Sequence, residues 1–430
     1  MMNVLWYYAI GFIIVWVLAF LLKGKYNITI DGIVLMLKTE KLEHLITRIA
    51  NISPRFWKYL INLSIPLGIF FMILMLVSLI ISLQMMFKTP TVSLILPGVD
   101  IPGSPIYIPF VTGFIALATV LIIHEGGHGV LARAEGVSID SVGLILLAII
   151  PGAFVEPNEN EIKKLNTWSK IRIYFAGPMF NITLCLIALI ITAGIGGFMA
   201  SEDLYTSDGM EISSVIPASP AEGVLSEGMV INQINGINTN NYSAYTKYLN
   251  TTHVGDNLTF TTDKGTYSLI TSSNPNNASL SYIGIRSSQH EVVSDNAKAK
   301  YGTIIPAILP TINEIFYYIF FLNFAVGTFN LLPMKPLDGG LILEEILKTK
   351  VVPERRLEFN KALNRYTRLF PRSIRCIISR IFNDILNFIH NHELSDEKSE
   401  KITVWMSTIL IVILVILILY GFVPAILSLF

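Results

Sequence analysis

The chain has 430 residues and no net formal charge, with 52% hydrophobic and only 14% charged residues. Its mean hydropathy of +0.58 is typical of a protein with several membrane-spanning helices and excludes an ordinary soluble domain. Because no excess of positive charge is present, no nucleic acid is expected as a partner. The two cysteines, Cys185 and Cys376, cannot form a disulfide framework.

Six apolar segments are long enough to cross a hydrocarbon core, which requires about 20 helical residues. The first of them lacks a small-residue cleavage site and is therefore expected to remain as a span. The sequence predicts a polytopic α-helical protein of the cell membrane with about six transmembrane helices. The expected spans are Val4–Leu22, Ile61–Phe87, Tyr107–Ala132, Ile171–Met199, Ile315–Leu332 and Val404–Leu427.

The distribution of basic residues predicts the orientation of these spans. Three connecting segments, Lys23–Lys58, Arg133–Arg172 and Lys335–Lys401, hold 25 of the 31 Lys and Arg residues. The positive-inside rule places them in the cytosol and both termini outside. Within the first segment, Thr39–Ala50 is expected to form an amphipathic helix. The third suits either a helix lying on anionic lipid heads or a solvated basic loop.

The run LIIHEGGHGVLA at the end of the third apolar segment carries the most informative motif. His124 and His128 are four residues apart, so they share one helix face on which both rings can reach one tetrahedral Zn²⁺. Glu125 lies close enough to take a proton from a water activated by the metal. Polar residues at a helix end near the cytosol are the alternative. Zinc is favoured because ionisable groups inside a bilayer are costly and usually functional.

A soluble insert, Ser201–Ser294, separates the fourth and fifth apolar segments. Short β-prone runs alternate there with turn residues, which predicts a small β-rich domain outside the membrane. The stretch from Ser213 to Asn241 resembles a PDZ domain, and a generic β-rich domain is the alternative. The resemblance implies a loop for a peptide or C-terminal carboxylate at Tyr282, Ile283, Gly284 and Ile285.

A catalytic zinc site needs three protein ligands and an open position, so a third ligand is required elsewhere. The best candidate is Asp338 in NLLPMKPLDGG, where Gly339 and Gly340 allow a close backbone approach. The third and fifth apolar segments both run inward under the predicted orientation. The histidines and Asp338 are therefore expected on the same, cytosolic side of the bilayer.

Together these motifs resemble those of the site-2 protease family of intramembrane zinc metalloproteases. The run from Phe175 to Asn181 is similar to a third family motif, F-x-G-x-x-x-N. The resemblance implies one Zn²⁺ per chain on His124, His128 and Asp338, with Glu125 as general base. It also implies that Asn330 contacts the substrate backbone or the developing oxyanion. The implied substrates are single-span membrane proteins cleaved in the lipid bilayer.

A shorter apolar run, Val142–Val155, is interrupted by Pro151 and Gly152 and reads as a re-entrant hairpin or interfacial segment. The family resemblance implies a β element here, beside the active site. A strand edge would offer free backbone groups to an unwound substrate. A lipid-facing loop is the competing interpretation. The expected clamp residues are Gly143, Leu144, Ile145, Leu146 and Leu147.

The predicted organisation places two halves of a catalytic core, 107–200 and 301–347, on either side of a PDZ-like domain at 201–300. The flanking parts are the first span with its cytosolic segment, the second span with its outer loop, a basic cytosolic segment and the last span, at 1–60, 61–106, 348–402 and 403–430. Two other functions stay open. A catalytically idle PDZ scaffold would be free to lose Glu125, and a metal transporter would usually need a chain of ligands.

Overall fold

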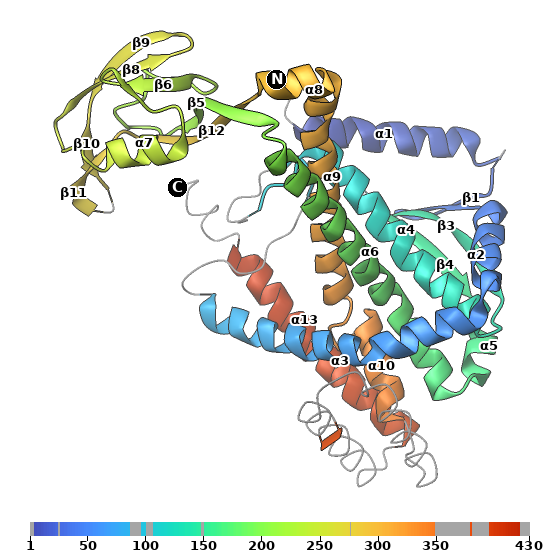
Figure 1. Cartoon of the computed structure of the whole chain (residues 1–430). Helices are drawn as coiled ribbons and strands as arrows, with labels where there is room; N and C mark the ends of the chain where they lie inside the picture. Colours follow the sequence, from blue (N-terminus) through green and yellow to red (C-terminus); the bar gives the residue numbers. More distant parts are fainter. Residues whose placement is uncertain are drawn as a thin grey trace. The chain divides into compact units, whose positions relative to one another are not determined.

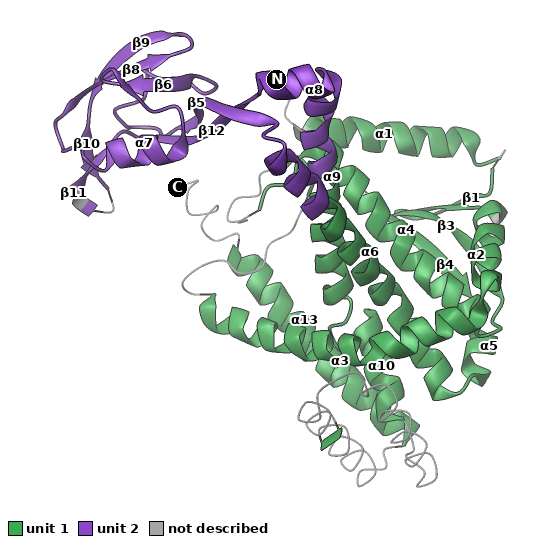
Figure 2. Cartoon of the chain, viewed as in Figure 1, with its two compact units in different colours: residues 1–191, 314–430 green, residues 192–313 purple. Residues whose placement is uncertain are grey.

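The computed structural model describes residues 4–24, 26–86, 96–99, 106–147, 150–275, 277–348, 379–380 and 395–421 (Figure 1). The chain divides into two compact units. Unit 1 comprises Met1–Ile191 and Glu314–Phe430, and unit 2 comprises Thr192–Asn313 (Figure 2). The predicted insert at 201–300 lies within unit 2. Most of the predicted basic segment at 348–402 lies outside the described residues.

Five of the described helices are long and apolar enough to cross a membrane. In the most apolar stretch of each of these helices, at most 28% is buried inside the protein. Most of their apolar surface therefore faces outward, as lipid contact requires. The N-terminal apolar helix α1 (Val4–Leu22) is shorter, and the expected number of about six spans is not confirmed. The five are α3 (Pro54–Met85), α4 (Phe110–Ala134), α6 (Thr167–Ser201), α9 (Ile304–Phe329) and α13 (Asp396–Gly421).

Glycines let the central helices of unit 1 approach one another closely. Helices α4 and α6 run side by side in Figure 1, and a Cβ at Gly127 would lie 2.9 Å from the Ala176 carbonyl oxygen. On α9, a Cβ at Gly327 would lie 3.1 Å from the Cβ of Asn181 on α6. Gly126, by contrast, faces open space. Small residues at such crossings are typical of membrane helices, which gain van der Waals contact where backbones meet.

A four-stranded antiparallel sheet lies in unit 1 beside these helices. Its strand order is β1-β2-β3-β4, so the hairpin β1–β2 from the N-terminal part extends the hairpin β3–β4 that follows α4. The predicted hairpin within Val142–Val155 is therefore confirmed as a β element, whereas β1 and β2 had no sequence prediction. The amphipathic helix expected at Thr39–Ala50 is α2 (Glu40–Ile52). The strands are β1 (Ile28–Asp31), β2 (Val34–Lys38), β3 (Ile139–Leu147) and β4 (Ile150–Pro157).

A buried ion cluster joins the ends of α3, α4 and α6. Glu135, at the end of α4, accepts a hydrogen bond from Arg172 Nε at 2.6 Å and lies 3.3 Å from Lys58 Nζ. Its side chain is only 4% exposed. Burial opposes ionisation, but the hydrogen bond and charge of Arg172 and the charge of Lys58 outweigh it and lower the pKa of Glu135. The cluster thus connects the ends of three helices, one of which, α4, carries His124 and His128.

The segment after α9 folds tightly and begins a short helix, α10 (Asp338–Leu347). A Cβ at Gly339 would lie 2.3 Å from the Leu332 carbonyl oxygen, and one at Gly340 would lie 2.4 Å from Lys335 N. The expected close backbone approach at both glycines is confirmed. Lys335 N also donates to Ser407 Oγ of α13 at 2.8 Å. The C-terminal helix thus supports the turn that leads to Asp338.

Unit 2 is a β-rich fold with its own buried core, which includes Met210, Ile231 and Phe260. Its main sheet has the order β12-β5-β6-β8-β9, with β7 paired to β6. The first and last long strands pair along their length from Tyr205↔Val293 to Val215↔Ile285. Its elements are β5 (Tyr205–Val215), β6 (Val230–Ile234), β7 (Ile237–Asn238), α7 (Tyr242–Leu249), β8 (Asn257–Thr262), β9 (Gly265–Ile270), β10 (Ser272–Asn274), β11 (Asn277–Tyr282), β12 (Ile285–Val293) and α8 (Asp295–Tyr301).

Candidate active site

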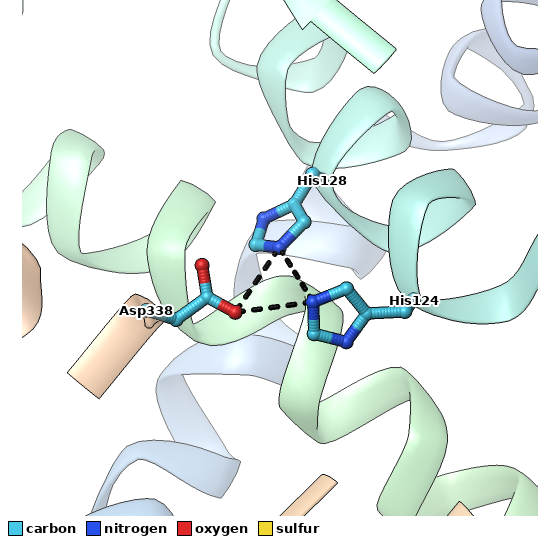
Figure 3. Close-up of side chains that lie close together, drawn as sticks. All are labelled: His124, His128 and Asp338. Carbon is cyan, nitrogen blue, oxygen red and sulfur yellow. Dashed lines mark hydrogen bonds and ion pairs between the residues drawn. The ribbon is translucent and has the colours of Figure 1, made fainter. Parts of the chain in front are cut away.

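Three side chains from two distant parts of the chain converge at one point in unit 1 (Figure 3). His124 Nε2 and His128 Nε2 are 3.3 Å apart. Asp338 Oδ2 lies 3.2 Å from the first and 3.3 Å from the second. The three atoms therefore form a nearly equilateral triangle. The three side chains are only 12–13% exposed, so this triangle is shielded from bulk solvent.

This triangle fits a tetrahedral zinc ion. Zinc bonds to nitrogen and oxygen of 2.0–2.2 Å separate neighbouring tetrahedral ligands by about 3.3–3.6 Å. The observed separations of 3.2–3.3 Å agree with the short end of that range. Asp338 Oδ2 is also buried and makes no conventional hydrogen bond within the described part of the chain. Two imidazoles and one carboxylate leave the fourth position for water, which is the usual arrangement of a catalytic zinc site.

Helix α6 forms the wall behind the histidines. A Cβ at Gly177 would lie 2.3 Å from His128 Nε2 and 2.9 Å from His124 Cε1, so only glycine leaves room for both rings. The other ring nitrogens also contact α6. His128 Nδ1 lies 2.8 Å from the Ile173 carbonyl oxygen, and His124 Nδ1 lies 3.3 Å from Asn181 Nδ2.

Glu125 and Asn330 line the same cavity as the three converging residues. This cavity has a volume of about 340 Å³, and its wall also includes Val155 and Pro157 of β4. Glu125 Oε2 accepts a hydrogen bond from Val155 N at 3.2 Å. The Glu125 carboxylate therefore lies beside both the His124–His128–Asp338 triangle and β4, the end strand of the sheet. The remaining lining residues are Ile162, Ile173, Tyr174, Pro336, Leu337 and Leu341.

The strand expected to present a free edge does not do so. β3 pairs with β2 on one side and with β4 on the other along all of Gly143, Leu144, Ile145, Leu146 and Leu147. Their backbone groups already belong to two ladders, so the predicted edge position of this segment is wrong. The strand at the end of the sheet beside the cavity is β4.

The predicted ligand loop of unit 2 connects β11 to β12. Its carbonyl groups are held inside the unit: Ile283 O accepts from Ala221 N at 3.1 Å, and Gly284 O accepts from Ile216 N at 2.8 Å. A Cβ at Gly284, whose φ is +86°, would collide with Ser219. The loop Tyr282–Ile285 is thus anchored to the segment whose sequence suggested a PDZ domain, and its ligand stays a prediction.

Some site residues had no prediction because their role depends on the backbone. Val155 N and Ile173 O are main-chain groups, and every residue except proline has both of them, whatever its side chain. Gly177 and Asn181 belong to the recognised F-x-G-x-x-x-N run, and their spacing of four residues places both on one helix face. The spacing predicts only the shared face, and the packing of α6 against α4 brings that face to the histidines.

Sequence comparisons relate this chain to two other proteins. An uncharacterized protein of Methanocaldococcus jannaschii is 27% identical over 369 residues, which cover 83% of this chain and 89% of the relative. A membrane-bound transcription factor site-2 protease homolog of Arabidopsis thaliana is 30% identical over 129 residues, 29% of this chain and 24% of that protein.

A solved structure, the PDZ domain of an SdrC-like protein from Listeria monocytogenes, matches 19% of the chain and 90% of that domain. Its identity is 24% and its TM-score 0.18. The sequence model of peptidase family M50 matches residues 112–370, which include His124, His128 and Asp338. The chain therefore belongs to peptidase family M50, the family of site-2 proteases, and is a membrane metallopeptidase by family.

Proposed function

We propose that this protein is an intramembrane zinc endopeptidase that hydrolyses peptide bonds of membrane-spanning substrates. The observation that carries the proposal is the triangle of His124, His128 and Asp338, with Glu125 in the same cavity. The motif helix α4 is itself one of the long apolar helices. A hydrolytic site on such a helix is suited to substrates that are embedded in lipid.

Each residue then has a distinct chemical role. His124, His128 and Asp338 would hold one Zn²⁺, which when bound polarises the scissile carbonyl and lowers the pKa of water to about 7. Glu125 takes a proton from the attacking water as the water oxygen adds to the scissile carbonyl carbon. Glu125 then gives that proton to the leaving amine as the C–N bond breaks. Asn330 lines the cavity and can donate to the substrate backbone or the developing oxyanion.

The outer edge of β4, to which no described strand is paired, supplies a way to bind an unwound substrate. Thr39 N donates to Val142 O, so the backbone groups of Val142 point toward β2. Alternation along an antiparallel ladder then directs the groups of residues 151, 153 and 155 away from β3. Val155 N contacts Glu125, and Pro151 has no N–H. Ala153 is thus the residue that can both donate to and accept from an added substrate strand.

The arrangement in the membrane is also part of the proposal. Both termini and unit 2 lie outside, and the active site lies near the cytosolic side, as the distribution of basic residues favours. Single-span membrane proteins in the surrounding bilayer are the substrates. Unit 2 would bind a peptide or C-terminal segment at Tyr282–Ile285 and admit only substrates that have lost a bulky outer domain.

Glu125→Gln tests the chemistry because it removes the base and keeps the shape of the side chain. Purified variant and wild-type protein are incubated with a panel of single-span substrates, with and without a zinc chelator. We expect the variant to retain about one zinc per chain and to lose cleavage by at least about 100-fold, the scale of general-base catalysis. The chelator should abolish wild-type cleavage, and added zinc should restore it.

The same experiment separates the enzyme from a catalytically idle scaffold. A scaffold would bind membrane partners equally well with and without the Glu125→Gln substitution, and would cleave none of the substrates. A zinc-loaded wild-type protein that cleaves no member of the panel, while it still captures partners through unit 2, would contradict the proposal. Elemental analysis of a protein in which both His124 and His128 are replaced by alanine provides the zinc-free control.

A further inference from the structure

The two histidines of the triangle are oriented by different kinds of group. His128 Nδ1 lies 2.8 Å from the carbonyl oxygen of Ile173. A carbonyl can only accept, so this nitrogen carries the ring hydrogen and leaves the Nε2 lone pair free for a metal. His124 Nδ1 instead faces the side-chain amide of Asn181, which is completely buried on α6.

The side-chain amide of Asn181 can accept the Nδ1 hydrogen of His124 in only one of its two orientations. Nδ2 stands 3.3 Å from Nδ1, and Oδ1 has no hydrogen-bond partner among the residues that the structure describes. An amide nitrogen only donates, which would leave the ring hydrogen on Nε2, the atom that faces Asp338. A half-turn of the amide exchanges two ends of equal size and brings Oδ1 to Nδ1.

We propose that Asn181 is a positioning residue of the metal site. In the zinc-loaded protein its Oδ1 accepts the Nδ1 hydrogen of His124, which fixes the tautomer and directs the Nε2 lone pair to the metal. A partner of this kind on the outer nitrogen of a histidine ligand typically contributes 10–100-fold in metal affinity. The inference rests on the proposed zinc site but does not depend on peptidase activity.

The zinc affinity of purified variants tests the proposal. It is measured by competition with a chromophoric chelator of known affinity. Asn181→Leu keeps the size of the side chain and removes its acceptor, so zinc binding should weaken about 10–100-fold. Asn181→Asp restores an acceptor of the same shape and should bind zinc within about threefold of wild type or more tightly. Loss in the first variant and rescue in the second would support the role.

Asn323 provides a matched control on α9. It is also completely buried, and its Nδ2 donates to Thr119 Oγ1 at 3.1 Å and to Ile319 O at 2.8 Å. Asn323→Leu should lower thermal stability equally with zinc and with chelator, and should leave zinc affinity unchanged. For Asn181→Leu the loss of stability should be larger with zinc, because the lost interaction belongs to the metal-bound state.

Three outcomes would overturn the inference. Zinc affinity of Asn181→Leu within twofold of wild type is the first. Equal losses of stability with and without zinc would assign Asn181 a packing role. If Asn181→Leu does not fold, the aspartate variant decides, and weakened zinc binding in folded Asn181→Asp contradicts the proposal. Failure of the wild-type chain to bind zinc would instead contradict the proposed function, so the two failures are distinguishable.

Discussion

At the scale of single residues, the site depends on the absence of a side chain at Gly177. A Cβ at this position would lie 2.3 Å from His128 Nε2, well inside van der Waals contact. Gly177→Ala should therefore displace at least one ligand ring and weaken zinc binding by about 10-fold or more, an effect comparable to the loss of a supporting group. Chelator competition measures the affinity, and cleavage should fall with it.

Gly126→Ala is the control for this substitution. Gly126 also lies on an apolar helix, but a Cβ there would meet nothing within 4 Å. Both changes raise helix propensity, by about 1 kcal/mol in soluble hosts, so a loss limited to Gly177→Ala must come from the collision. Unchanged zinc affinity in both variants would show that the histidines can move aside without cost.

Residue chemistry was the part of the site that the sequence predicted best. His124, His128 and Asp338 have side chains that few other residues can replace at a zinc ion, and their spacing and neighbouring glycines marked them. They converge as predicted. The contacts of Val155 N and Ile173 O could not be predicted, because every residue except proline has both backbone groups.

At the scale of elements, the sequence predicted a β hairpin after α4 but assigned its free edge to the wrong strand. The apolar, β-branched pattern of residues 142–155 describes a hairpin and contains no information about which further strand pairs with it. That strand is β2, about a hundred residues earlier in the chain, and its pairing with β3 covers the expected clamp. Long-range pairing of this kind depends on tertiary packing, which local sequence does not encode.

Ala153→Pro tests the edge of β4 without removing a ladder bond. The N–H of Ala153 points away from β3, so proline should cost little stability and still remove the donor proposed for the substrate. We expect cleavage of a single-span substrate to fall at least 10-fold, with zinc affinity unchanged. Cleavage rate and zinc affinity are measured on the same preparations, and thermal unfolding verifies the fold.

Ala153→Val is the matched control, because it enlarges the side chain and keeps the N–H. It should cleave at nearly the wild-type rate. Equal losses in both variants would indicate a steric effect in the cavity, and a normal rate in Ala153→Pro would contradict substrate pairing at β4. Proline at Ile145 or Leu147 cannot decide the question, because β3 is paired on both sides and the sheet itself would be damaged.

At the scale of the whole molecule, composition and apolar segments predicted a membrane protein with a β-rich insert. The separate compact unit at Thr192–Asn313 contains that insert. The division falls inside the long helices α6 and α9, between Ile191 and Thr192 and between Asn313 and Glu314, where each helix continues without a break. A boundary that depends on contacts made in space has no marker in the hydropathy of a continuous helix.

The pairing of β5 with β12 indicates where unit 2 can be removed. Tyr205 and Val293 are partners in the ladder, and such partners have Cα atoms about 4.5–5.5 Å apart. Residues 206–292 can therefore be replaced by a short Gly-Ser linker that joins the two strand ends. If unit 2 selects substrates and takes no part in the chemistry, this deletion should cleave a pre-trimmed substrate at the wild-type rate. It should also cleave a substrate that retains its outer domain, which the full chain rejects.

A deletion protein that also carries Glu125→Gln controls for contaminating proteases and should cleave neither substrate. Zinc content and thermal unfolding of the deletion protein must match those of the full chain before rates are compared. A folded, zinc-loaded deletion protein without activity would assign unit 2 a structural role in the core. Unchanged rejection of the longer substrate would mean that selection resides in unit 1, where β4 is the end strand of the sheet among the described residues and lines the cavity.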